Sequence, residues 1–138
     1  MLTFTSPAPL DYWALGLAEP TILVADDDEQ TRDVIAVKLQ AAGFHAITTD
    51  NGRSALRMIQ SEQPDMVILD VVMPGMDGLS VCYELQSSAQ TARIPVLMLS
   101  GLDRQVDIDL GRTVGADDYM VKPFHPAELL RRVRKLLS

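Results

Sequence analysis

The sequence predicts an α/β fold in which short buried strands alternate with helices around a parallel sheet. Three strands are continuous apolar runs of four residues, at 22–25, 66–69 and 96–99. None of these runs alternates with polar residues, so each is expected to be buried on both faces, as strands of a parallel sheet are. Two weaker candidates, residues 44–49 and 119–121, have the composition of strands nearer the edges of the sheet.

The segments that follow these strands have the apolar periodicity of helices. Apolar side chains recur there every three or four residues, which places each set on one face of a helix. The five sets are Ile35, Leu39 and Ala42; Ala55 and Ile59; Leu79, Cys82 and Leu85; Val106, Leu110 and Val114; and Leu129, Val133 and Leu136. Gly43 and Gly115 stand where helices are expected to end, and Pro126 where the last helix begins. A strand followed by a helix, five times over, predicts right-handed crossovers and helices on both faces of the sheet.

The length and the distribution of prolines predict one domain with an extension ahead of it. A chain of 138 residues is the size of a single ordinary domain. Residues 1–20 contain three of the eight prolines, the single Trp and no Lys or Arg. We therefore expect an N-terminal extension over 1–20 and a domain over 21–138. In the extension, Leu10, Trp13 and Leu17 are spaced to line one face of a short helix, so Trp13 is expected to pack on its own domain or on a second copy.

The composition indicates which classes of partner the protein can bind and which cellular compartment it occupies. The net charge of −7 disfavours a nucleic-acid surface, because phosphate backbones would be repelled. The basic stretch 131–135 is then explained as the solvated face of a C-terminal helix. No segment approaches the ~18 apolar residues of a membrane span, and the first residues lack the pattern of a secretory signal. The single Cys82 fits a reducing compartment. We expect a cytoplasmic protein without direct contact to a membrane or a nucleic acid.

Chemically active side chains follow the carboxyl ends of the predicted strands. The acidic triplet 26–28 follows the first strand, Asp70 the third, Ser100 the fourth and Lys122 the fifth. In a doubly wound sheet, ligands bind beyond these ends. Clustered carboxylates repel one another unless a cation neutralises them, and hard oxygen ligands select Mg²⁺ or a similar ion. Asp28 is instead expected to cap the helix that follows.

These residue types suggest a site for phosphoryl transfer. Asp70 can be the nucleophile, because a carboxylate that attacks phosphorus forms an acyl phosphate without a general base. Mg²⁺ would screen the phosphoryl oxygens from Asp26 and Asp27. Lys122 would pair with a second oxygen, and Ser100 would donate a hydrogen bond to a third. Positioning and charge neutralisation of this kind are most of what phosphoryl transfer requires of a protein.

Four segments resemble the motifs of bacterial two-component response-regulator receiver domains, the CheY-like family. The segments are TILVADDDEQ (21–30), LDVVMPGMDG (69–78), VLMLSG (96–101) and GADDYMVKPF (115–124). They occur in the family's order, each on the matching strand end, and the resemblance covers about residues 21–137. It implies a flavodoxin-like, five-stranded sheet with the strand order 2-1-3-4-5.

The resemblance also implies the roles of the acidic residues. Asp70 would be the phosphoacceptor, and its aspartyl phosphate would make the chain a phosphoprotein of a phosphorelay. Asp27 would bind Mg²⁺ directly, and Asp26 would act mainly through water. The Asp70 carboxylate and the backbone carbonyl of Val72 would complete the protein's contribution to the metal site.

Further roles follow for the residues on the last two strands. Ser100 matches the hydroxyl residue that moves toward the phosphoryl group, and Tyr119 matches the aromatic residue that changes rotamer with it. Lys122 matches the essential lysine of the family, and a cis peptide bond is expected between Lys122 and Pro123. The loop and helix start that follow the acceptor are matched by Pro74, Gly75, Asp77 and Gly78.

The implied function is signal transduction in a two-component system. A sensor histidine kinase or a histidine phosphotransfer protein would donate the phosphoryl group, and the receiver would then change its contacts with a downstream effector. Apart from this transfer and its own dephosphorylation, we expect no enzymatic activity. The chain is either a stand-alone receiver or the receiver part of a longer DNA-binding or enzymatic response regulator. The sequence identifies neither the cognate kinase nor the effector.

Two other classes share part of this pattern. A phosphatase of the haloacid-dehalogenase type also forms an aspartyl phosphate, but it places the nucleophile on the first strand in a D-x-D arrangement and needs a cap. Here Asp26 and Asp27 are adjacent, and the chain has no room for a cap. A flavodoxin shares the sheet but needs a hydroxyl- and glycine-rich phosphate loop where this chain has three aspartates. Turnover of p-nitrophenyl phosphate would favour the first class, and a yellow protein the second.

The resemblance also makes a homodimer one candidate assembly of this domain. Many DNA-binding members of the family dimerise through the fourth helix, fifth strand and fifth helix, and Asp118 with Arg132 can form one charged pair of that interface. Two other expected pairs each lack one member. Ile108 stands where a basic residue would face Glu128, and Thr113 stands where Arg134 would find its acidic partner. Surface ion pairs contribute only ~0–1 kcal/mol each. We therefore expect no standard symmetric dimer, and an exposed Ile108 that offers an apolar contact to another partner.

Overall fold

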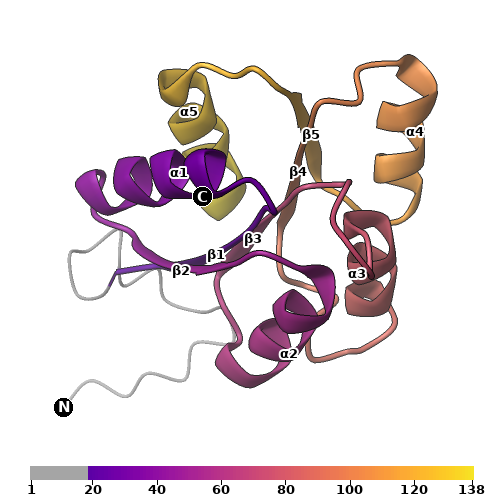
Figure 1. Cartoon of the computed structure of the whole chain (residues 1–138). Coiled ribbons are helices and arrows are strands. Elements are labelled where there is room, and N and C mark those ends of the chain that lie inside the picture. The colour runs from indigo at the N-terminus through magenta and orange to yellow at the C-terminus, as the bar shows by residue number, and fades with distance from the viewer. Residues whose placement is uncertain (1–18) are drawn as a thin grey trace, which may run out of the picture.

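Strands and helices alternate five times along the part of the chain that the structure, a computed structural model, describes, which is residues 19–138 (Figure 1). The elements are β1 (Thr21–Ala25), α1 (Glu29–Ala41), β2 (His45–Thr49), α2 (Gly52–Glu62), β3 (Met66–Leu69), α3 (Gly78–Gln86), β4 (Val96–Ser100), α4 (Gln105–Thr113), β5 (Asp118–Val121) and α5 (Pro126–Leu137). The predictions for Trp13 and its neighbours lie outside the described residues.

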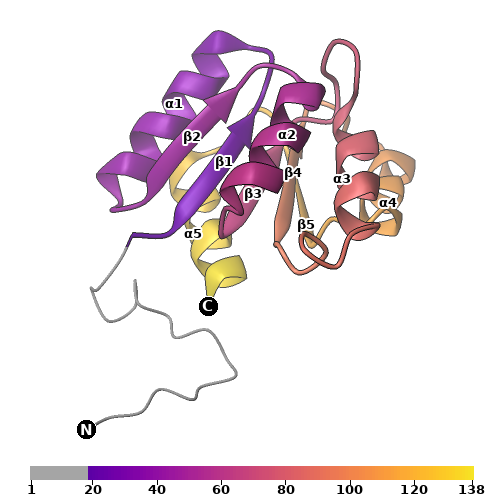
Figure 2. The same ribbon diagram turned by 90° about the horizontal axis from the view of Figure 1, so that it is seen from below.

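The five strands form one parallel sheet in the order β2-β1-β3-β4-β5, as the resemblance implies. The two strands with the weaker sequence pattern, β2 and β5, lie at the edges. Helices α1 and α5 cover one face, and α2, α3 and α4 cover the other (Figures 1 and 2). The order changes direction between β1 and β3, so the carboxyl ends of these strands flank the position where ligands of such sheets bind.

The core has two layers because successive side chains of a strand point to opposite faces. In β3, Met66 and Ile68 pack against α1 and α5, whereas Val67 and Leu69 pack against α2, α3 and α4. All residues of β3 and β4 are buried, as their unbroken apolar runs predict. Within residues 19–138, no helix has the length and apolar composition needed to cross a membrane.

Helix ends follow local side-chain chemistry. The Asp28 side chain accepts a hydrogen bond from the Thr31 backbone N–H at 3.0 Å and so caps α1, as predicted. Asp77 caps α3 in the same way, through the Ser80 N–H at 2.7 Å. Gly43 follows α1 with a φ of +94°, a left-handed conformation that favours glycine.

The buried face of α4 differs from the prediction. Val106 and Leu110 were expected in the core but are 61% and 47% exposed. Val114, the third residue of the predicted set, does pack against the core, as do Ile108 and the buried Gly111, so the predicted exposure of Ile108 is wrong as well. Apolar periodicity fails here because the residue at the centre of the buried face is a glycine, which has no side chain to reveal that face.

The start of α3 depends on a close backbone contact. The Gly78 N–H donates a hydrogen bond to the Val71 carbonyl at 2.8 Å, and a Cβ on Gly78 would lie 2.1 Å from the Asp70 carbonyl oxygen. Any larger residue must therefore displace the backbone of the loop that begins with Asp70.

We predict that Gly78→Ala lowers the free energy of unfolding by about 1–3 kcal/mol, the usual cost of overpacking. Urea denaturation followed by circular dichroism measures this change. Gly101→Ala is the matched control, because a Cβ there meets no atom within 4 Å. The control should change stability by no more than about 0.5 kcal/mol, and equal effects of the two substitutions would contradict the prediction.

Candidate functional site

The sheet brings the acidic residues together at its carboxyl edge. Beyond the last paired residues of β1 and β3, the Asp70 N–H donates to the Ala25 carbonyl at 2.9 Å, which places Asp70 beside Asp26. One carboxylate oxygen from each of Asp26, Asp27 and Asp70 lies within 4.8 Å of the others. These are the three aspartates that the sequence predicts to converge.

Lys122, the residue directly after β5, reaches this cluster. Its Nζ donates to Asp26 Oδ2 at 2.7 Å and to Asp70 Oδ2 at 3.1 Å. Its backbone N–H donates to the Ser100 carbonyl at 2.8 Å, so the pairing of β4 with β5 continues to the residue that carries the ammonium. The predicted cis peptide bond between Lys122 and Pro123 is confirmed.

The carboxylates differ in how they are held. Asp26 is buried, and both its oxygens are engaged, Oδ1 by the Asp28 N–H at 2.9 Å and Oδ2 by Lys122. The Asp27 side chain, in contrast, is exposed and accepts no hydrogen bond from the described residues. Asp27 is therefore the carboxylate with the most freedom to bind an ion directly.

Burial governs the electrostatics of the site. Asp70 is 6% exposed, and burial raises the pKa of its carboxyl above the ordinary value even though Lys122 opposes the shift; the nearby Asp26 adds to it. Burial alone would lower the pKa of Lys122, but the hydrogen bond to Asp26 and the charges of both carboxylates raise it. The lysine therefore stays charged and pairs with two of the three clustered carboxylates, Asp26 and Asp70.

A cavity of about 310 Å³ opens over these groups. Its lining consists of Asp27, Asp70, Val72, Ser100, Gly101, Leu102 and Lys122. Val72 is 57% exposed and Leu102 36% exposed, so both residues line the open side of this cavity. The excess of carboxylate over ammonium charge and the oxygen-only donors suit a hard divalent cation.

Ser100 and Tyr119 meet at the backbone of Leu102. The Leu102 N–H donates to Ser100 Oγ at 3.2 Å, and Tyr119 Oη donates to the Leu102 carbonyl at 2.8 Å. Both side chains are buried, and burial raises the pKa of the Tyr119 hydroxyl. These backbone contacts of Leu102 were not predicted, because a peptide group is the same in every residue and the side chain does not reveal its partners.

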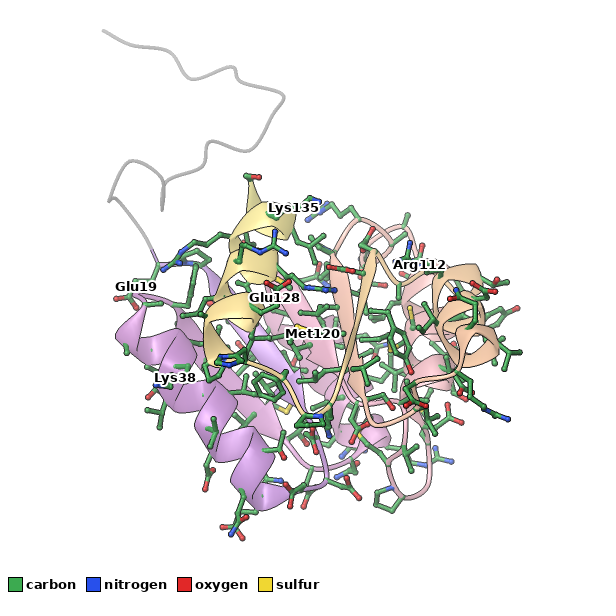
Figure 3. The ribbon with its side chains drawn as sticks, turned by 90° about the horizontal axis from the view of Figure 1, so that it is seen from above. Glu19, Lys38, Arg112, Met120, Glu128 and Lys135 are labelled. Atoms are coloured by element: carbon green, nitrogen blue, oxygen red, sulfur yellow. The ribbon has the colours of Figure 1, made fainter. Side chains whose placement is uncertain are left out.

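Arg132 on α5 makes its contacts within the chain. It donates to Asp118 Oδ1 at 3.1 Å, to the Tyr119 carbonyl at 3.0 Å and to Glu128 Oε1 at 2.8 Å. Figure 3 labels Glu128 on α5 and Met120 on β5, and Met120 is buried in the cluster that includes Leu129 and Val133 of α5. The charged pair of Asp118 and Arg132, considered above as a contact between two copies, therefore forms inside one copy.

Comparison with known proteins establishes the family. The model of the response regulator receiver domain matches residues 22–134. The chain belongs to the response regulator receiver family. Receivers of response regulators are in general signal transducers without enzymatic activity of their own, and their partners are histidine kinases.

Several curated relatives of this receiver are transcriptional regulators. It is 41% identical over 116 residues to the alkaline phosphatase synthesis transcriptional regulatory protein PhoP of Bacillus subtilis, a match that covers 84% of this chain and 48% of PhoP. It is also 41% identical over 118 residues to the DNA-binding regulator RpaA of Synechocystis, covering 86% of this chain and 49% of RpaA. The receiver thus spans about half the length of these relatives.

Solved receiver structures share the whole fold. The chemotaxis response regulator CheY4 of Vibrio cholerae is 32% identical, with a TM-score of 0.83, over 87% of this chain and 100% of CheY4. The receiver domain of the sensor histidine kinase PA1611 of Pseudomonas aeruginosa is 28% identical, with a TM-score of 0.81, over 87% of this chain and 98% of that one. That structure has a magnesium ion coordinated in its active-site cleft.

The raised pKa of Asp70 predicts a pH-dependent effect of Asp70→Asn. A carboxyl group whose pKa is raised in the folded state stabilises the fold only while it is protonated, below about pH 4, and this stabilisation is lost as pH rises through the folded-state pKa. Asp70→Asn should therefore raise the free energy of unfolding at pH 7 in EDTA, and this gain should shrink toward pH 4.

Urea unfolding of both proteins across this pH range measures the effect. Asp33→Asn, a change at an exposed position of α1, is the control and should alter stability by no more than about 0.5 kcal/mol at any pH. An Asp70→Asn protein that is less stable than the wild type at pH 7 would show that Lys122 compensates fully for the burial of this carboxylate.

Proposed function

We propose that this receiver accepts a phosphoryl group on Asp70 from the phosphohistidine of a sensor histidine kinase or a histidine phosphotransfer protein. The observation that carries the proposal is the position of the Asp70 carboxylate. It is buried beside Asp26, contacts the Lys122 ammonium at 3.1 Å, and still faces an open cavity. A nucleophile of this kind needs no general base, only access and neutralised charge around it.

The chain's own groups supply the charge compensation. A carboxylate oxygen of Asp70 would attack phosphorus as the bond from phosphorus to the donor's imidazole nitrogen breaks, and that electron pair would leave with the imidazole. The Lys122 Nζ, which lies between Asp26 and Asp70, would pair with a phosphoryl oxygen. The Ser100 hydroxyl, at the wall of the same cavity, would donate to another oxygen.

Mg²⁺ is the proposed cofactor, and it would neutralise the negative charge that collects on the phosphoryl oxygens. Asp26, Asp27, Asp70 and the backbone carbonyl of Val72 would hold it. The convergence of the three carboxylates supports this set, as does the magnesium in the cleft of the receiver of PA1611. The engaged oxygens of Asp26 and the free carboxylate of Asp27 favour a water-mediated contact from the first and a direct one from the second.

The output of the receiver is proposed to be a protein contact. When Ser100 turns to the phosphoryl group, its hydrogen bond from the Leu102 N–H is released, and Tyr119, whose hydroxyl binds the carbonyl of the same residue, would adjust with it. The length of PhoP and RpaA favours a second possibility, that this receiver serves as the regulatory part of a longer DNA-binding regulator. The residues 1–20 are proposed to be an extension of the receiver domain over 21–138.

Labelling with acetyl phosphate tests the acceptor. With Mg²⁺, the wild type should gain the mass of one phosphoryl group, the Asp70→Asn protein should gain none, and EDTA should suppress labelling of the wild type. Asp33→Asn serves as the control and should be labelled like the wild type. Undiminished labelling of Asp70→Asn would exclude this acceptor, and sustained turnover of p-nitrophenyl phosphate would favour a phosphatase instead.

The apolar rim predicts a slow loss of the phosphoryl group. Val72 and Leu102 stand beside the acceptor and carry no group that can position an attacking water. The aspartyl phosphate should therefore be long-lived, and Val72→Asn or Leu102→Asn should shorten its lifetime in a radiolabel chase. Val72→Ala and Leu102→Ala are the controls for loss of side-chain volume. Unchanged decay in both Asn variants would remove the basis of this prediction.

The contacts of Arg132 predict that activation does not produce the symmetric dimer through α4, β5 and α5. Arg132 is already satisfied by Asp118, Glu128 and the Tyr119 carbonyl of its own chain, and Ile108 packs inward. Sedimentation with beryllofluoride, a phosphoryl mimic, should show no such dimer. A crystal structure of that complex with Asp118–Arg132 pairs across a two-fold axis would contradict the prediction.

A further inference from the structure

Helix α4 has a glycine where the switch residue Tyr119 packs against it. Gly111 is buried, and a Cβ built on it would lie 3.0 Å from Cδ2 and 3.2 Å from Cε2 of the Tyr119 ring. Met98, the next neighbour, would be 3.8 Å away. A methyl group at this position therefore needs room that only a movement of the ring or of the helix can provide.

The Tyr119 ring has little freedom to move aside. At one end its backbone lies in β5, in register with Met98 of β4. At the other end Tyr119 Oη donates to the Leu102 carbonyl at 2.8 Å. Tyr119 is only 5% exposed between these two attachments. A shift of the ring away from α4 would therefore strain or break the hydrogen bond to the loop that begins at Ser100.

The backbone of α4 does not explain the glycine. Gly111 lies inside the helix, before its last residues, and is not one of the described glycines with a positive φ, which are Gly43, Gly75 and Gly115. In a helix interior, glycine is less favourable than alanine. The glycine thus weakens the helix. The close contact with the Tyr119 ring explains its presence, because that contact leaves no room for a side chain.

We infer that Gly111 is a positioning residue for Tyr119, because the absence of a side chain at Gly111 leaves the space that the ring occupies. The ring, held in this position, couples α4 to the Ser100–Leu102 loop. The inference about packing stands by itself. Its consequence for signalling rests on the proposed function, since it requires that Ser100 and Tyr119 respond to the phosphoryl group. In that case, a change in the ring's position is transmitted directly to the helix that carries the exposed Val106 and Leu110.

A double-mutant cycle on thermal stability tests the packing. Gly111→Ala should lower the melting temperature of the wild type, because the methyl group meets the ring. In a Tyr119→Leu background, which removes the ring, the same substitution should raise the melting temperature, because alanine favours the helix. Arg112→Ala, at the exposed neighbouring position, is the control and should act alike in both backgrounds. The same sign for Gly111→Ala in both backgrounds would overturn the inference.

Fluorine NMR of protein labelled with 3-fluorotyrosine reports the ring itself. The chain has three tyrosines, and Tyr119→Phe assigns the resonance of Tyr119. In Gly111→Ala this resonance should move toward the position of a solvated tyrosine, while that of Tyr83, 59% exposed on α3, should stay. A Tyr119 resonance that keeps its position in Gly111→Ala would also overturn the inference.

Beryllofluoride binding tests the consequence for signalling. Because coupling is reciprocal, displacing Tyr119 should weaken beryllofluoride binding by about fivefold or more, and the loss should be absent when Gly111→Ala is made in the Tyr119→Leu background. Equal affinity of wild type and Gly111→Ala would overturn the coupling. Failure of the wild type to bind beryllofluoride would instead count against the proposed function, and the cycle and the NMR measurement would still decide the role of Gly111.

Discussion

The ammonium of Lys122 joins the buried carboxylates of Asp26 and Asp70, and most of the site depends on this contact. Two such carboxylates on adjacent strands repel one another strongly where water is excluded. The lysine follows a third strand, β5, and its Nζ lies 2.7 Å from Asp26 Oδ2 and 3.1 Å from Asp70 Oδ2. Since this ammonium pairs with Asp26 and Asp70 and the third carboxylate, Asp27, forms no ion pair with it, the cluster keeps net negative charge, which favours a divalent cation.

The parallel sheet makes this arrangement possible. Parallel strands have all their carboxyl ends on one edge, so residues distant in the sequence become neighbours without any long loop. Hydrogen bonds continue past the strand ends, from the Asp70 N–H to Ala25 and from the Lys122 N–H to Ser100, and these bonds fix where the charged side chains begin. The loop after Asp70 packs closely against the start of α3, because Gly78 has no side chain that would clash with the Asp70 carbonyl.

Much of the fold and of the site could be predicted from the type of each residue and its position relative to the predicted strands. Unbroken apolar runs identified β3 and β4 as central strands, and Asp26, Asp27, Asp70 and Lys122 converge as their places after the strands indicate. The predictions failed on α4, where Val106 and Leu110 face solvent. Helical periodicity identifies a buried face by its apolar side chains, and a face centred on glycine does not produce that pattern.

The class of fold, the order of the elements and the identity of the chemical groups follow from local periodicity and residue type, so they can be read along the chain. Which partner each group has depends on how the elements pack together. Arg132 binds Asp118 within its own chain, Tyr119 binds the carbonyl of Leu102, and Gly111 accommodates the Tyr119 ring. These contacts involve backbone carbonyl groups, or the space left where glycine has no side chain. Such groups come into contact only when strands and helices from distant parts of the chain pack together.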